Sequence, residues 1–175
     1  MMKKNFQYVI LMLISVLFCM NNLYAQQKTK KQQKEEKRIA QQMYVDSLVA
    51  AKEFVFIGRM ALPQGTRSIN LATRQNFVKF FPDSVSGDMP FFGKAYSVST
   101  YGGDGGIIFS GKPEVYEFKT TKKNHVVKVK IKSNNDSYQL TLSISYNGSA
   151  SLMINSVNRS SISYSGDIFE PEKKK

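Results

Sequence analysis

The sequence contains no tryptophan, one histidine and one cysteine among its 175 residues. The cysteine, Cys19, lies in an apolar run near the N-terminus, and the bulky Phe18 before it disfavours lipid attachment, which needs a small residue there. If that run is removed after export, the remaining chain has no thiol, which excludes a disulfide framework and cysteine catalysis. A chain of about 150 residues can bury enough surface to be held by its core alone.

Recognisable catalytic and cofactor motifs are also missing. The sequence has no nucleophile elbow, no metal-binding histidine pair, no phosphate-binding loop and no dinucleotide fingerprint. The one histidine, His125, begins a lysine-flanked run with no carboxylate at a suggestive spacing, so we expect an exposed histidine at a strand end. We therefore assign no catalytic residue, no metal ligand and no cofactor. A pair formed by Asp88 and Asp104, if the fold brings them together, is the alternative of an acid-dependent hydrolase.

The first 25 residues have the composition of a secretory signal peptide. Lys3 and Lys4 precede an apolar run over residues 8–20, and Ala25 supplies the small residue before a cleavage site. The run is shorter than the roughly 20 apolar residues that a membrane-spanning helix needs. We predict an exported protein, with an uncleaved N-terminal anchor as the alternative.

Positive charge is concentrated outside the predicted domain. The formal net charge is +12, of which residues 39–169 carry +5. Residues 26–38 form a basic, low-complexity linker with almost no apolar side chains, and residues 170–175 form a charged tail. A nucleic-acid-binding domain carries its basic stripe on the domain itself. We therefore predict no nucleic-acid partner, and membrane contact only through the signal or the basic linker, whose favoured role is a plain spacer.

Apolar periodicity predicts one helix followed by a β-rich domain. Ile39, Met43 and Leu48 recur at roughly helical spacing, which predicts a helix over residues 39–52, either packed on the core as a lid or binding a partner. After Lys52 short apolar runs alternate with turn residues, and residues 82–90 are assigned to turns. The predicted strands lie at 54–57, 68–71, 76–81, 94–98, 107–109, 115–121, 126–132, 138–146, 150–157 and 161–165.

The last third of the chain predicts an antiparallel meander. Over residues 138–146 apolar side chains alternate with Gln, Thr and Ser, as in a strand with one buried and one solvated face. Residues 126–132 alternate Val or Ile with Lys, so a register slip of one residue would bury three lysines. Asn147 and Gly148 predict a type I′ hairpin turn. Because nine or ten strands exceed a flat open sheet, we predict a single-domain antiparallel barrel or sandwich.

The most unusual stretch is residues 89–109, which holds five aromatic residues and five glycines. The glycines around Asp104 predict a tight turn; an anion-binding loop or a calcium site is a weaker alternative, since no lysine, helix or second oxygen ligand follows. Phe91 and Phe92 predict a plug in the core or, if exposed, an apolar binding patch. The candidate ligand or partner surface consists of Phe91, Phe92, Gly93, Tyr96, Tyr101, Gly102, Gly103, Asp104, Gly105 and Gly106.

Several longer motifs carry a resemblance. They are RMALP from Arg59, RSINL from Arg67, PFFGKAY from Pro90, YGGDGGI from Tyr101, NGSA from Asn147 and NSVNRSSISYSG from Asn155. Together they resemble domain-of-unknown-function family 4251, over nearly all of the predicted domain. The resemblance implies a small β-rich domain in the envelope, periplasm or cell surface, of a Gram-negative anaerobe, and it implies no activity. Lys94 is a departure, because arginine is more usual there.

Three hypotheses follow. The first, which we favour, is an exported non-enzymatic binding or structural module, whose partner is another envelope protein or a small apolar ligand. The second is a lipocalin-like small-ligand carrier, which requires a hollow barrel. The third is the hydrolase that uses Asp88 or Asp104.

Overall fold

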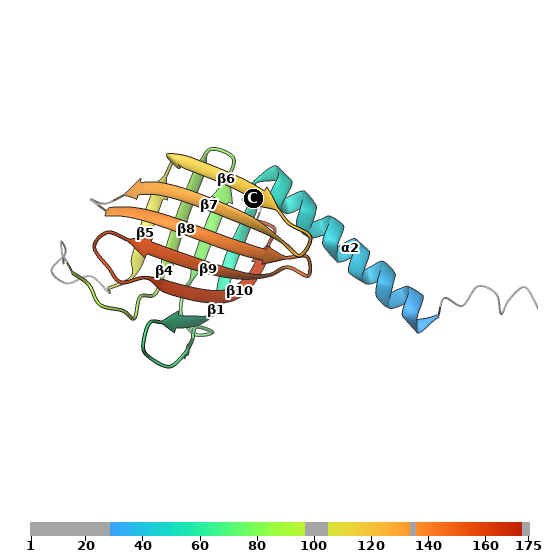
Figure 1. Ribbon diagram of the computed structural model, residues 1–175, viewed down its shortest axis with the longest axis horizontal. Coiled ribbons are helices and arrows are strands. Elements are labelled where there is room, and N and C mark those ends of the chain that lie inside the picture. Colours follow the sequence, from blue (N-terminus) through green and yellow to red (C-terminus); the bar gives the residue numbers. More distant parts are fainter. Residues whose placement is uncertain (1–28, 97–104, 134–135, 173–175) are drawn as a thin grey trace, which may run out of the picture. The chain divides into compact units, whose positions relative to one another are not determined.

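The computed structural model describes residues 29–96, 105–133 and 136–172. The chain divides into two compact units, Met1–Ile39 and Ala40–Lys175, and the description below concerns each by itself. Figure 1 shows one helix and a strongly curled sheet. The elements are α2 (Lys30–Ala51), β1 (Phe54–Pro63), β2 (Ile69–Asn70), β3 (Phe77–Phe81), β4 (Ser84–Met89), β5 (Ile107–Gly111), β6 (Val115–Thr120), β7 (Asn124–Ser133), β8 (Asp136–Ser145), β9 (Ser149–Ser156) and β10 (Ile162–Phe169).

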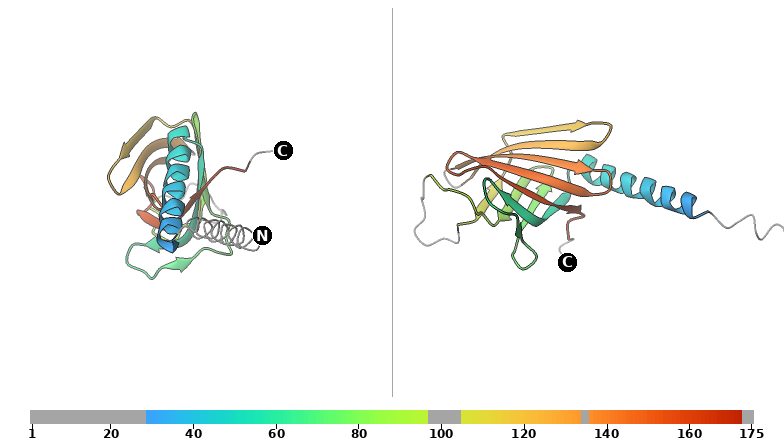
Figure 2. Two further views of the ribbon diagram at one scale, coloured as in Figure 1. Left: turned by 90° about the vertical axis from the view of Figure 1, so that its right-hand side faces the viewer. Right: turned by 60° about the horizontal axis from the view of Figure 1, so that its bottom comes forward.

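The second unit is an antiparallel half-barrel. Its strands follow the order β5-β4-β3-β1-β10-β9-β8-β7-β6, and the short β2 pairs with β1 beside this path. The sheet curls until β3, β4 and β5 cross behind β7, β8 and β9 (Figures 1 and 2). The prediction of a mainly β domain with one N-terminal helix is confirmed, with the correction that the sheet does not close: β5 and β6 remain at its two ends.

Strand β1 makes the corner of the half-barrel. Its pairing with β10 shifts between Gly58 and Met60, a bulge that bends the strand. Opposite the bulge lies Gly166, where an added Cβ would stand 2.0 Å from the carbonyl oxygen of Ile57. A glycine is therefore required at this position, because the two backbones approach too closely for any side chain.

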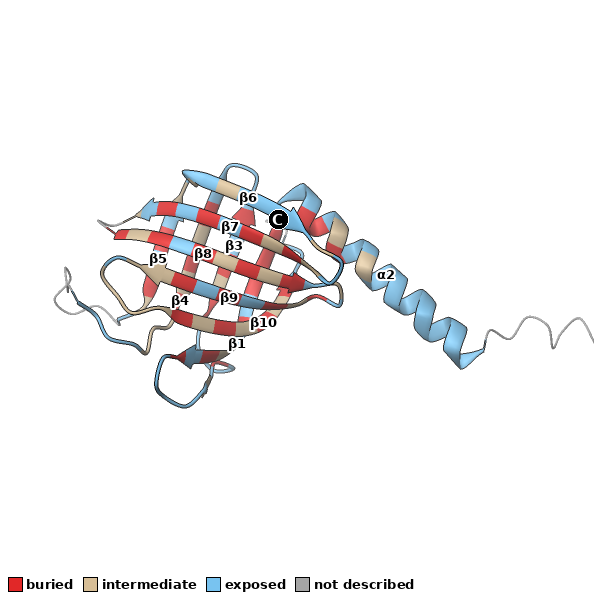
Figure 3. Ribbon diagram, viewed as in Figure 1, coloured by how far each residue is buried: buried red, intermediate tan, exposed pale blue. Residues whose placement is uncertain are grey.

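Alternate residues of every long strand fill the interior. Figure 3 shows this alternation as buried residues regularly spaced along β7, β8 and β9. The predicted parity of the meander is correct: residues 138, 140, 142 and 144 are buried, as are 127, 129 and 131, while the lysines between the latter are exposed. The fully buried side chains include Tyr164, Phe54, Phe56, Phe80, Phe109, Leu71 and Met89.

Helix α2 begins at Lys30, nine residues before the predicted start. The linker prediction for residues 26–38 missed its N-cap: the Gln32 amide N–H bonds Oγ1 of Thr29, and the Thr29 amide bonds the Gln32 side chain, which is a capping box. At the other end Lys52 takes a φ of 56°, and the amides of Lys52 and Glu53 donate to the carbonyls of Val49 and Leu48. These bonds form a Schellman motif. No helix within the described ranges is long and apolar enough to span a membrane.

Three local predictions were wrong. Residues 82–90, assigned to turns, contain strand β4, whose alternating burial places Val85, Gly87 and Met89 inside. Residues 94–96 form no strand and make only a single bridge between Ala95 and Arg159; residues 97 and 98 lie outside the described ranges. The hairpin at Asn147 and Gly148 exists, but its loop has three residues, because only Gly148 has a positive φ and its amide bonds the Ser145 carbonyl. This is a type I turn closed by a glycine, not type I′.

Candidate functional site

The predicted surface around residues 91–106 is partly described, and its described part is organised by two arginines. Phe91 and Phe92 are half-buried and pack against the core. The guanidinium of Arg159 lies 5.2 Å from the ring centre of Phe91, and that of Arg74 lies 5.4 Å from the ring centre of Phe92. The phenylalanines therefore combine both predicted roles: one side of each pair closes the core, and the other side is capped by a cation.

The turn between β9 and β10 holds this loop in place. The Lys94 amide donates to Oγ of Ser160, the Ser160 amide donates to the Lys94 carbonyl, and Arg159 donates to the carbonyl of Gly105. Gly93 is required here, since an added Cβ would stand 2.3 Å from Oγ of Ser160. We call this arrangement of residues 90–96, 105–106 and 157–160 the loop platform.

The platform exposes two apolar side chains next to one another in the fold. Val157 and Tyr96 are 73% and 70% exposed, more than any other large apolar side chain in the described part of the chain. The Tyr96 amide donates to the Asn158 carbonyl at 2.8 Å, which brings their two segments together. Of the remaining predicted surface residues, Gly105 and Gly106 lie before β5, and Tyr101, Gly102, Gly103 and Asp104 lie outside the described ranges.

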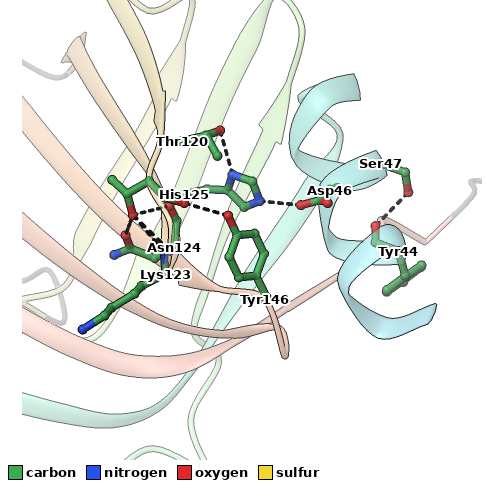
Figure 4. Close-up of polar contacts among 9 residues, drawn as sticks. Tyr44, Asp46, Ser47, Thr120, Lys123, Asn124, His125 and Tyr146 are labelled. Atoms are coloured by element: carbon green, nitrogen blue, oxygen red, sulfur yellow. Dashed lines mark hydrogen bonds and ion pairs between the residues drawn. The ribbon is translucent and has the colours of Figure 1, made fainter. Parts of the chain in front are cut away.

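A second cluster surrounds His125, and the prediction that this histidine is exposed was wrong. His125 is 4% exposed, and its Nε2 lies 2.6 Å from Oδ1 of Asp46 on α2. Its Nδ1 lies 3.0 Å from Oγ1 of Thr120, as Figure 4 shows. No sequence signal pointed to this contact, because Asp46 precedes His125 by 79 positions.

Aromatic rings and a polar turn enclose this histidine. Phe118 stacks on the imidazole with ring centres 5.6 Å apart, and Tyr146 meets it edge-on at 5.1 Å. The Tyr146 hydroxyl donates to the carbonyl of Thr121 at 2.7 Å, and Asn124 donates to Oγ of Ser143. The ring thus has a hydroxyl on one nitrogen, a carboxylate on the other and rings on its faces. This geometry fastens the second half of α2 to the β6–β7 hairpin.

Three other buried polar side chains lie apart from this cluster. Asp136 accepts bonds from Ser156 Oγ at 2.6 Å and from the Val157 amide at 3.2 Å, which fixes the start of the loop platform turn. Asn76 binds the Leu71 and Arg74 carbonyls through its amide group. The hydroxyl of Tyr116 is buried and has no hydrogen-bond partner within the described residues. Burial raises the pKa of Tyr116 to about 12.

Tyr164 crosses the core to the loop platform. Its hydroxyl donates to the carbonyl of Pro90 at 2.8 Å. Burial raises its pKa above the ordinary range of tyrosine. Burial, followed by the nearby Asp136 carboxylate, also raises the pKa of Tyr138. The neutral, hydrogen-bonding form of these phenols is therefore the one that the core accommodates.

Charge on the second unit is concentrated in one hairpin. Residues 112–132 contain seven lysines and two glutamates, a net charge of +5, whereas residues 39–111 and 133–169 together contain seven basic and seven acidic residues. Glu114 lies 2.9 Å from Nζ of Lys132 and 3.6 Å from Nζ of Lys130. The hydrogen bond with Lys132 is the main cause that lowers the pKa of Glu114. The predicted charge of +5 for the domain is thus a property of the β6–β7 hairpin.

The predicted acid pair is not described as a pair. Asp88 lies on β4, opposite Ile108 and Phe77, and Asp104 is outside the described ranges. Among described residues, no group of three or more His, Cys, Asp and Glu side chains is placed to hold a metal ion.

The fold and the loop platform define a small β half-barrel module with one N-terminal helix. The chain belongs to the family described as domain of unknown function DUF4251, whose family model matches residues 22–168. A crystal structure of a DUF4251 family protein from Bacteroides eggerthii DSM 20697 has the same fold: it is 18% identical, with a TM-score of 0.59, and the match covers 75% of this chain and 88% of that chain. No curated protein matches the chain. The predicted resemblance is confirmed.

Proposed function

We propose that this protein is an exported, non-enzymatic binding or structural module of the Gram-negative envelope, and that it binds its partner on its outer surface. The observation that carries this proposal is the pairing of Tyr96 and Val157 on the loop platform, the two most exposed large apolar side chains of the described residues. The Tyr96–Asn158 backbone bond and the Arg159–Phe91 contact hold this pair on a rigid base. A fixed apolar patch beside a cation is typical of a binding surface.

The packed interior supports an outer binding surface. Large side chains that point into the half-barrel, such as Phe54, Phe80 and Tyr164, are fully buried, and Phe54 stacks on Phe80 with ring centres 4.5 Å apart. Close-packed side chains occupy the space that a carrier of lipocalin type would give to its ligand. A small apolar ligand is therefore expected on the platform rather than inside.

Site-specific photo-crosslinking tests the proposal. A photoreactive side chain at position 96 or 157 is expected to give one discrete adduct in cells that produce the protein naturally. The same group at Met153, an exposed apolar residue on β9, is the matched control and is expected to give none. Equal crosslinking at all three positions would show that the platform has no special role. A small molecule retained at one copy per chain in native mass spectrometry, and unaffected by Tyr96→Ala, would favour the carrier.

Export has its own test. Fractionation is expected to find the protein in the envelope fraction, with a mature N-terminus at Gln26 if the signal is cleaved after Ala25. A full-length protein in the cytoplasm would refute this part of the proposal.

One observation favours a second candidate, a hydrolase. Thr120, His125 and Asp46 form a hydroxyl–imidazole–carboxylate chain with contacts of 3.0 Å and 2.6 Å. This is the connectivity of a nucleophile, a base and an orienting acid. Hydrolysis of an activated ester such as p-nitrophenyl acetate that is abolished by both Thr120→Ala and His125→Gln would support it. A rate equal to that of Thr120→Ala leaves the cluster with its structural role.

A further inference from the structure

The outer edge of β6 has unpaired backbone groups. The Thr121 amide donates to the Asn124 carbonyl where the β6–β7 hairpin closes, and this bond fixes the phase of the ladder. Because the residues of an antiparallel edge strand point alternately toward and away from their partner, the N–H and C=O groups of Tyr116, Phe118 and Thr120 point away from β7. Within the described residues these groups have no hydrogen-bond partner.

This edge is also open to solvent. Five of the six residues of β6 are exposed, and Figure 3 shows the strand almost entirely pale blue at the end of the sheet. Phe118 is 47% exposed although it lies on the inner face, and Val115 on the outer face is 42% exposed. An exposed strand edge of this kind is a template for pairing with another chain.

The two faces of β6 differ in chemistry. On the inner face Tyr116 and Phe118 offer aromatic surface, since their partners Val129 and Val127 point into the core. The outer face belongs to the β6–β7 hairpin with its net charge of +5, and Lys119 lies there beside the edge. A strand added to this edge would place alternate side chains beside aromatic rings and beside lysines.

We propose that the outer edge of β6 binds an extended segment of a second protein in which acidic residues alternate with apolar residues. Backbone hydrogen bonds to Tyr116, Phe118 and Thr120 supply affinity, and the alternation supplies register and direction. This surface is separate from the loop platform, and it identifies a partner by charge and strand propensity.

Two other occupants fit less well. A second copy of this chain, paired β6 to β6, would bring two hairpins of charge +5 together, and like charges oppose that contact. An anionic membrane surface would use lysines alone, whereas Glu117 faces Lys128 across the ladder and Glu114 contacts Lys130 and Lys132. Neither occupant accounts for the unpaired edge as well as a strand does.

The test is fluorescence-polarisation binding of a capped eight-residue peptide of alternating Glu and Val to the full-length protein. Two derivatives carry N-methyl groups on alternate amides, one on the Glu positions and one on the Val positions. Only one of the two phases removes the donors that face β6, so we expect one derivative to bind about tenfold or more weakly and the other to bind nearly as the parent does. Lys119→Glu is expected to weaken binding by about fivefold, and its matched control, Lys79→Glu on β3, to leave it unchanged.

Other outcomes overturn the inference. Absence of binding, or equal binding of both N-methylated peptides, excludes strand addition. Binding of the full-length protein to phosphatidylglycerol vesicles that is lost in Lys119→Glu, without the N-methyl effect, assigns the hairpin to a membrane. Loss of peptide binding in Tyr96→Ala assigns the peptide to the loop platform, which refutes the β6 site and leaves the proposed binding function intact.

Discussion

Replacing Asp46 by alanine tests whether the His125 cluster holds helix α2 on the half-barrel. The change removes the carboxylate 2.6 Å from Nε2 of an imidazole that is 4% exposed. A buried donor left without its acceptor destabilises a fold by about 1–3 kcal/mol. The Asp46 side chain is 43% exposed, so water partly replaces it and the lower half of that range applies. Alanine also favours a helix over aspartate by up to about 0.7 kcal/mol.

The net expectation is a loss of about 1 kcal/mol in the free energy of unfolding. With a urea m-value of about 2 kcal/mol/M, the unfolding midpoint falls by about 0.5 M at unchanged slope. Asp46→Asn keeps an acceptor for the ring N–H and is expected to fall between alanine and the natural residue. The neighbouring Ser47, exposed on the same helix, gives the matched control Ser47→Ala. Equal midpoints for Asp46→Ala and Ser47→Ala would refute the anchoring role of the histidine.

Three further predictions concern the core and the corner. Tyr164→Phe leaves the Pro90 carbonyl without its 2.8 Å partner and is expected to lower the free energy of unfolding by about 1 kcal/mol; an unchanged urea midpoint contradicts this. Gly166→Ala is expected to prevent folding, seen as loss of soluble protein, whereas Gly65→Ala, with a φ of +75° and open space around it, is expected to lose only about 1 kcal/mol; similar losses at both sites would contradict the close approach to Ile57. Because the pKa of Tyr116 is about 12 in the folded state and that of a free tyrosine is about 10, the unfolded state loses this proton first, so stability falls as pH rises between these values. Tyr116→Phe is expected to reduce that fall and to be neutral or stabilising at pH 7, since its hydroxyl is unpaired; an unaltered slope from pH 10 to pH 12 would argue against the shift.

The regular half of the fold was predictable because its signal is local. Period-two alternation along β7 and β8 fixes which side chains are buried, and the short polar links leave antiparallel pairing as the simplest connection. The capping box at Thr29 and Gln32 was equally visible in the sequence, yet the lack of apolar residues after it favoured a linker. Strand β4 was missed for a different reason: Gly87 lies inside it to make room for the ring of Phe109, its partner across the ladder, and a glycine in sequence predicts a turn.

The candidate sites depend on contacts that no local pattern contains. Arg159 reaches Phe91 only because the β9–β10 turn bridges to Ala95, and His125 meets Asp46 only because α2 packs on the sheet. The unpaired edge of β6 is a consequence of strand order: the same six residues in the middle of the sheet would have both edges paired. Counting charge over the whole domain hid the hairpin for a related reason, since +5 spread over residues 39–169 predicts no surface, whereas +5 confined to two adjacent strands at an open edge selects an acidic partner. Position in the sheet, which the sequence encodes only through the fold, turns an ordinary lysine-rich hairpin into a surface with a preferred ligand.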